Sequence, residues 1–186
     1  MTAKHPAVPL THLLLAVAVA AVWGTNFVVS EGARGPLAPV VFAGLAFPLG
    51  LGPAAFFRKR PAVRWTNRAA YGVVIGAGQF GLLYIAMESS ISAGLASLVI
   101  QTQVFFTIGL AMWISAERLR PFQWLALALG GAGLVLIALR GGATATPLGL
   151  GLVLAAAACW ACGNLLARSG GAQTMRAYVV WASVCV

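Results

Sequence analysis

The stretch 20-AAVWGTNFVVSEG-32 places an indole, a hydroxyl and a carboxamide inside an otherwise apolar run that closes at Glu31. In hydrocarbon, an amide without a hydrogen-bond partner costs several kcal/mol, so Asn26 must face another helix or a wet cavity. The fold and the function therefore depend on whether this run lies in lipid, and on what stands opposite Asn26.

The composition is that of an integral membrane protein. Of the 186 residues, 61% are hydrophobic and 8% are charged, and the mean hydropathy is +0.93. A soluble domain spends about a quarter of its residues on charge. Six segments have the length of about 20 apolar residues that a helix needs to cross a bilayer: 10–29, 39–57, 69–87, 91–115, 122–139 and 148–166. A seventh begins at Ala177, and we expect the chain to stop within that span.

The basic residues predict the orientation. If the N-terminus is cytoplasmic, ten of the 12 Lys and Arg residues lie inside and only Arg34 and Arg140 lie outside. Most of this bias comes from 58-RKRPAVRWTNR-68, and it indicates a cytoplasmic N-terminus. The net charge of +9 thus reflects topology, and nucleic acid is not an expected partner. A signal peptide over the first run is not favoured, because no soluble domain follows it.

Two stretches of the chain resemble each other. AAVWGTNFVVSE around Trp23 and AACWACGNLLAR around Trp160 align at an offset of 137 residues, and a charged residue follows each Trp by eight positions (Glu31 and Arg168). An odd number of spans separates the two copies, which predicts that they cross the membrane in opposite directions. We therefore expect a polytopic helix bundle with one five-helix repeat over 10–139 and the start of an inverted second repeat over 148–186.

The inventory of reactive groups argues against an intramembrane enzyme. Asp is absent, no Glu lies in the middle of a span, and His5 and His12 lie at the N-terminal edge. No nucleophile therefore has a partner base, and no metal or cofactor is expected. Cys159 and Cys162 have the spacing of a redox pair but no strand–helix context, so we interpret them as small packing residues.

Neutral polar and aromatic side chains recur inside the spans. The candidates for a small-molecule pathway are Trp23, Asn26, Gln79, Gln101, Gln103, Trp160 and Asn164, with Tyr84 and Thr107 at similar positions. Each of them alone is equally well explained by a bond between two helices, worth about 0.6 kcal/mol. Gln101 and Gln103 are about 200° apart around a helix, so they cannot face the same neighbour.

Four stretches closely resemble the drug/metabolite transporter superfamily, in its EamA-type branch: AVWGTNFVVSEG, GAGQFGLLYIAM, SAGLASLVIQTQVFFTIGLAMWISAERL and AAACWACGNLLA. The resemblance covers nearly the whole chain, and its nearest match is to exporters of O-acetylserine and cysteine. It implies ten helices in two inverted repeats, an inner-membrane location, and export of small amino-acid-like metabolites by alternating access.

The sequence departs from that family in two places. Glu31 stands where relatives often carry Lys, and Ala46 stands where they often carry Arg. Both changes remove a cation that could meet a substrate carboxylate. Glu88, at the end of the third span, is the nearest candidate for energy coupling. The alternative to a transporter is a truncated or dimer-dependent membrane subunit of the same superfamily, in which a homodimer supplies the missing helices.

A hypothesis for Asn26 follows from its position. Trp23 lies three residues before it and so shares its helix face. We expect Asn26 to face the substrate path with Trp23 as its wall, and Trp160 to approach from the sixth span across the repeat axis. The expected partners are then a small-molecule substrate and the lipid bilayer.

Overall fold

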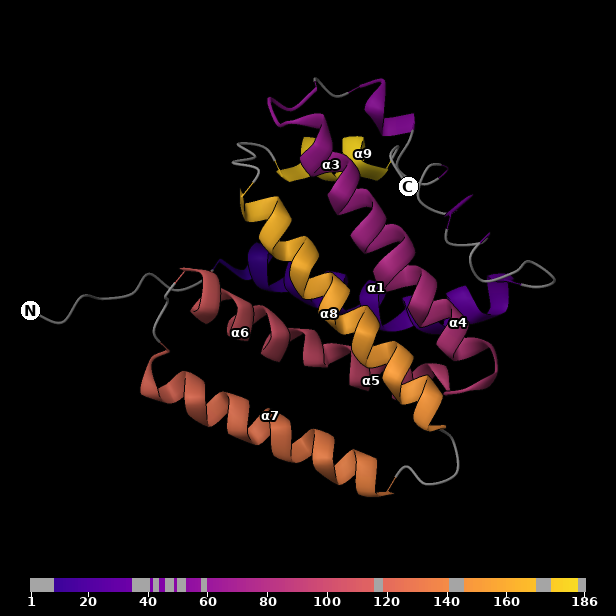
Figure 1. Cartoon of the computed structure of the whole chain (residues 1–186), viewed down its shortest axis with the longest axis vertical. Helices are drawn as coiled ribbons and strands as arrows, with labels where there is room; N and C mark the ends of the chain where they lie inside the picture. The colour runs from indigo at the N-terminus through magenta and orange to yellow at the C-terminus, as the bar shows by residue number, and fades with distance from the viewer. Residues whose placement is uncertain are drawn as a thin grey trace, which may run out of the picture.

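The computed structural model of the protein describes residues 9–34, 41, 44–45, 49, 53–57, 60–115, 119–140, 146–169 and 175–183. The elements within these ranges are all helices, which confirms the all-α prediction (Figure 1). Four of them are long and apolar enough to cross a membrane: Leu10–Ser30, Trp65–Glu88, Ala93–Ile114 and Pro147–Ser169. The chain is a multi-pass membrane protein.

The described helices lie on five of the six predicted spans. Their bounds are α1 Leu10–Arg34, α3 Trp65–Gly72, the π-helix η1 Val73–Gly81, α4 Leu82–Ser89, α5 Ala93–Val99, the 3-10 turn η2 Ile100–Thr102, α6 Gln103–Ser115, α7 Pro121–Arg140, α8 Pro147–Ser169 and α9 Met175–Ser183. The predicted span 39–57 lies largely outside the described residues. The predicted span 122–139 is α7, whose apolar stretch Pro121–Leu136 is shorter than the four spanning candidates.

Helix α8 is the centre of the described structure. It packs against α3, η1 and α4 on one side and against α5, η2 and α6 on the other (Figure 1). Ala156, Ala157 and Ala161 on this helix are completely buried. Small side chains let neighbouring backbones approach closely, which is how helices associate in a membrane that offers no hydrophobic drive.

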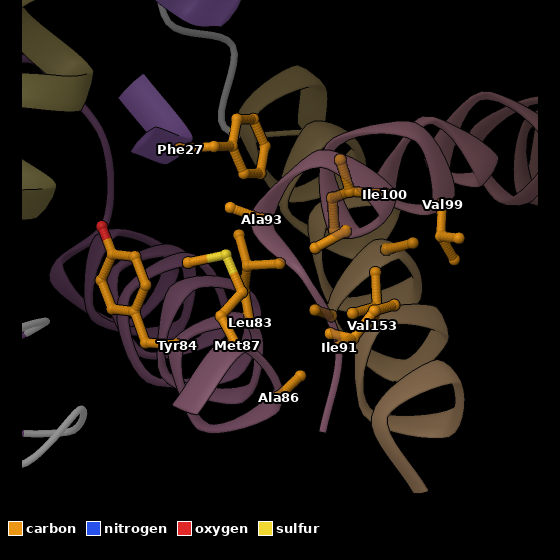
Figure 2. Packing of buried hydrophobic residues seen from close by; sticks show 13 residues of the cluster. Phe27, Leu83, Tyr84, Ala86, Met87, Ile91, Ala93, Val99, Ile100 and Val153 are labelled. Carbon is orange, nitrogen blue, oxygen red and sulfur yellow. The ribbon is translucent and has the colours of Figure 1, made fainter. Parts of the chain in front are cut away.

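The main core cluster lies where α1, α4, α5 and α8 meet. Its members are Phe27, Leu83, Tyr84, Ala86, Met87, Ile91, Ala93, Ala96, Val99, Ile100, Val153, Ala156 and Ala157 (Figure 2). Phe27 is the contribution of α1 to this cluster and is 3% exposed. It therefore fixes the rotation of α1 about its own axis, and with it the direction in which Trp23 and Asn26 point.

The third span and α8 pack closely through one glycine on each side, Gly78 in the third span and Gly163 on α8. A Cβ at Gly78, in the π-helix η1, would lie 2.9 Å from the Cys159 sulfur, and a Cβ at Gly163 would collide with the Ile75 side chain. The sequence left open whether these glycines break the helix or let it pack. The helix is continuous but widened over Val73–Gly81, and it closes onto α8 at Gly78.

Candidate functional site

Two tryptophans from helices far apart in sequence are in contact. The ring centroids of Trp23 on α1 and Trp160 on α8 are 5.1 Å apart, with 40° between the ring planes. Trp23 also makes an edge contact with Phe27, at 6.5 Å and 79°. Phe27 is buried in the core and Trp160 packs against that core, so both hold Trp23 in place from the protein side.

Asn26 lies one turn from Trp23 and is half-buried. Its Oδ1 accepts a hydrogen bond from the Ser30 hydroxyl at 3.5 Å, within the same helix. Among the described residues, no hydrogen bond joins the Asn26 amide to another helix. The Thr25 hydroxyl, by contrast, is satisfied by its own backbone, since it donates to the Ala21 carbonyl at 3.0 Å. Within the described residues, the Asn26 amide therefore has hydrogen-bonding capacity that packing against another helix does not use.

A second polar group joins α8 to α6, and we call it the amide cluster: Gln103, Thr107 and Asn164. The Asn164 Nδ2 lies 3.4 Å from both the Gln103 Oε1 and the Thr107 Oγ1. The Thr107 hydroxyl donates to the Gln103 Oε1 at 3.2 Å. Asn164 lies one turn after Trp160, so these two residues share one side of α8. This side of α8 contacts Trp23 of α1 through the Trp160 indole, and Gln103 and Thr107 of α6 through the Asn164 amide.

The remaining candidates lie elsewhere. Gln79 is in η1 and is 2% exposed. Gln101 is exposed and lines an apolar cavity of about 430 Å³ between α5–α6 and α7, on a different side from Gln103. Glu88 is exposed in the last turn of α4. Trp23 and Asn26 thus lie on α1, Trp160 and Asn164 on α8, and Gln103 and Thr107 on α6. Gln101 and Glu88 lie apart from these residues.

A junction at the basic end of the bundle was not predicted from the sequence. The Asn67 Nδ2 donates to the Leu166 carbonyl at 3.1 Å, and the Tyr178 hydroxyl donates to the Asn67 Oδ1 at 2.7 Å. These bonds join α3, α8 and α9. The sequence does place Asn67 and Tyr178 at the ends of apolar runs. It does not show that the ends of α3, α8 and α9 meet.

The side chains of the candidate site on α1, α8 and α6 are uncharged, and they can bind a ligand by hydrogen bonds and aromatic contacts. Among the described residues, no group of three or more His, Cys, Asp or Glu side chains could hold a metal ion. Cys159 and Cys162 are both free thiols. The indoles offer flat apolar faces, and the amides offer both donors and acceptors, so the arrangement can bind a small polar molecule without forming a covalent bond to it.

The comparisons with known proteins agree with one another on the family. Residues 10–139 match the EamA-like transporter family. The chain is 41% identical over 176 residues to a "probable amino-acid metabolite efflux pump" of Salmonella typhimurium strain LT2, covering 91% of this chain and 59% of that protein. A protein of the same description from Escherichia coli strain K12 is 41% identical over 178 residues, covering 92% and 59%.

A more distant relative is the "uncharacterized inner membrane transporter YedA" of Escherichia coli strain K12. It is 26% identical over 163 residues, covering 84% of this chain and 52% of that protein. No solved structure matches the chain significantly. The chain thus spans about 59% of the length of the two relatives with 41% identity.

Proposed function

Because the chain belongs to the EamA-like transporter family, which is a family of transporters and not of enzymes, we propose that it works as a secondary transporter that exports small amino-acid-like metabolites. The observation that carries this proposal is the 41% identity to two probable amino-acid metabolite efflux pumps, over 91% and 92% of the chain. Alternating access, with the two repeats moving against each other, is the mechanism that the predicted inverted repeat would provide.

In this proposal the substrate passes between α1 and α8. Trp23 and Trp160 form an aromatic wall, and an indole face attracts an ammonium group such as that of an amino acid. Asn26 and the amide cluster supply hydrogen bonds to a carboxylate or to other polar groups. These six side chains carry no charge, so a zwitterion would bind by dipoles and aromatic faces and would not need a fixed counterion.

Gln79, Gln101 and Glu88 take other roles in this account. Gln79 is buried in η1 and is a packing residue in this proposal. Gln101 faces the cavity beside α7, outside the proposed path. Glu88 remains the candidate for proton coupling, and its exposed place at the end of α4 would put it at a mouth of the path.

The proposed location is the inner membrane with a cytoplasmic N-terminus, supported by the ten-to-two basic bias and by a relative described as an inner membrane transporter. A cysteine at Ala62, which is exposed, should be labelled by an impermeant reagent only after cells are permeabilised. Asn67, in the same basic segment, is unsuitable for this purpose because its side chain is bonded to α8 and α9. Labelling of Ala62→Cys in intact cells would contradict the orientation.

The function is tested by following labelled cysteine or O-acetylserine in cells that lack their own exporters. Cells producing the protein should accumulate less label than cells with an empty vector. Trp160→Ala should abolish most of the difference, whereas Trp124→Ala, an exposed residue on α7, should preserve it. Equal accumulation with and without membrane-inserted wild-type protein would contradict the proposed substrate class.

A further inference from the structure

Helix α1 has two parts that differ in burial: residues 10–23, which we call the free part, and residues 26–34, which we call the anchored part. Every residue of the free part is exposed. In the anchored part, Phe27 is 3% exposed and points into the core cluster, and Ser30 is 6% exposed (Figure 2). Side-chain packing thus fixes the anchored part relative to the core, and it fixes the free part far less.

The two parts are joined at Gly24, a glycine that no close contact in the described structure requires. A Cβ at Gly24 would meet nothing within 4 Å, and its φ lies outside the left-handed region that favours glycine. At Gly78 and Gly163, by contrast, neighbouring side chains leave no room for a Cβ. A glycine inside a helix is destabilising relative to alanine, because it leaves the backbone more conformational freedom. At Gly24 this freedom is the physical effect that the glycine adds.

Thr25 weakens the same turn of the helix. Its hydroxyl donates to the Ala21 carbonyl at 3.0 Å and to the Val22 carbonyl at 3.1 Å. In an α-helix these two carbonyls accept from the backbone N–H groups four residues later, so the hydroxyl competes with the backbone bonds that cross Gly24. Such bonding of a Thr side chain back to its own helix slightly destabilises the helix and often bends it. Gly24 and Thr25 therefore concentrate bending at one turn of α1.

Trp23 stands directly before this turn and contacts helix α8. The ring centroids of Trp23 and Trp160 are 5.1 Å apart, and aromatic pairs interact over about 4.5–7 Å, so a displacement of about 2 Å reaches the limit of this contact. A kink of about 20° at Gly24 would move Leu13 by about 5 Å, because the helix rises about 1.5 Å per residue. Bending at this turn thus makes or breaks the indole contact and displaces the free part.

We propose that α1 has a hinge at Gly24 and Thr25, about which the free part moves while the anchored part stays fixed to the core. The contact between Trp23 and Trp160 is made in the conformation of this structure and is broken when the free part swings away. A gating role for the hinge rests on the proposed function. In the proposed orientation the free part is the cytoplasmic half of α1, so its swing opens the path between α1 and α8 towards the cytoplasm.

Distances between two spin labels on the full chain, reconstituted in lipid nanodiscs, test the hinge. The three native cysteines are replaced by Ala, and one label is placed at Leu154→Cys, an exposed position on α8. The second label is placed at Leu13→Cys in the free part or, as the matched control, at Val28→Cys in the anchored part, and both of these positions are exposed. The Leu13 pair should give two populations that differ by up to about 5 Å, and the Val28 pair should give one.

Two glycine variants show where the bending occurs. Gly24→Ala should change the ratio of the two Leu13 populations about fivefold, because alanine favours the regular helix over glycine. Gly151→Ala is the matched control, since Gly151 lies within α8 and its Cβ would also meet nothing within 4 Å, and the ratio should stay as in the wild type. A single Leu13 population in the wild type, equal spread of the Leu13 and Val28 pairs, or a ratio that Gly24→Ala leaves unchanged would overturn the proposal.

Export measurements separate the hinge from the proposed function. Gly24→Ala should lower the maximal rate of labelled cysteine export several-fold, because it alters the conformational step of alternating access, whereas Gly151→Ala should keep that rate. An unchanged rate in a Gly24→Ala protein whose distances have shifted would overturn the gating role. The distance measurements need no substrate. Two populations in a wild type that exports no cysteine would therefore contradict the proposed substrate class and support the hinge.

Discussion

Helices α1 and α8 carry the two similar tryptophan motifs, yet they are packed very differently. On α8, Val153 and the three alanines at 156, 157 and 161 are 0% exposed, and neighbours lie on both of its sides. On α1, Leu13, Leu14 and Leu15 are 56%, 60% and 63% exposed. Phe27 and Ser30 are the side chains of α1 that are buried among the described residues.

The two copies of the tryptophan motif are therefore held in the bundle in different ways. Helix α8 is held by close contacts of small residues with several helices, so its indole and amide are fixed relative to the core. Among the described residues, helix α1 packs against α5, buries Phe27 and Ser30, and contacts Trp160 through Trp23, while its leucines at 13, 14 and 15 are exposed. In the proposed path, α8 is the fixed wall and α1 is the wall with the fewer constraints.

The largest effect on folding is expected at a glycine of α8. Gly163→Val places side-chain atoms where Ile75 lies, and such overpacking costs about 1–3 kcal/mol in the free energy of unfolding. Two matched controls exist, because a Cβ at Gly24 on α1 or at Gly151 on α8 would meet nothing within 4 Å. Denaturation of the three variants in detergent measures the difference.

Both controls should stay near the wild-type stability. If Gly24→Val proved as damaging as Gly163→Val, α1 would be packed as closely as α8, and the contrast between the two helices would be lost. If Gly151→Val alone were damaging, the tight surface of α8 would lie on a different side from the one that faces Ile75.

A smaller effect is expected at the amide cluster. Asn164→Leu removes two contacts, to Gln103 and Thr107, and bonds of this kind are worth about 0.6 kcal/mol each inside a membrane. The expected loss in the free energy of unfolding is therefore about 1 kcal/mol. On α1, Thr25→Val removes only a bond to its own helix and should cost less. Equal losses in the two variants would show that the amide cluster does not join α6 to α8.

The sequence predicted most helices because the length of an apolar run is a strong constraint in lipid. Their ends were less predictable. The third span was expected over 69–87, but its helix begins at Trp65, because the polar first turn WTNR lies at the interface and hydropathy does not reveal it. The 3-10 turn Ile100–Thr102 and the π-helix Val73–Gly81 have no signal beyond an abundance of glycine in the latter.

The candidate site was predictable only where a motif was duplicated. The two similar stretches suggested that Trp160 approaches Trp23, and the rings are in contact. The bond between Asn164 and Gln103 could not be foreseen, because it depends on how α6 and α8 are rotated against each other. For the same reason the sequence could place Gln101 and Gln103 on different sides but could not say which of them faces α8.

No measurable effect on stability or transport is expected at the cysteines. Cys159 packs against Gly78, Cys162 is exposed, and both are free thiols. Replacing both by Ala keeps the residues small, so export and the free energy of unfolding should stay unchanged. The measurement is export before and after mild oxidation in the two proteins. An oxidation-dependent loss in the wild type that the double variant lacks would contradict the packing interpretation.

If Asn26 faces the substrate path, the variant Asn26→Leu should impair transport without destabilising the fold. The variant keeps the volume of the side chain and removes an amide whose described partner is Ser30 on its own helix. The account predicts that export of cysteine or O-acetylserine per folded molecule falls sharply while the melting temperature and expression hold. Undiminished export, together with a loss of about 0.6 kcal/mol in the free energy of unfolding, would contradict it and would make Asn26 a packing residue.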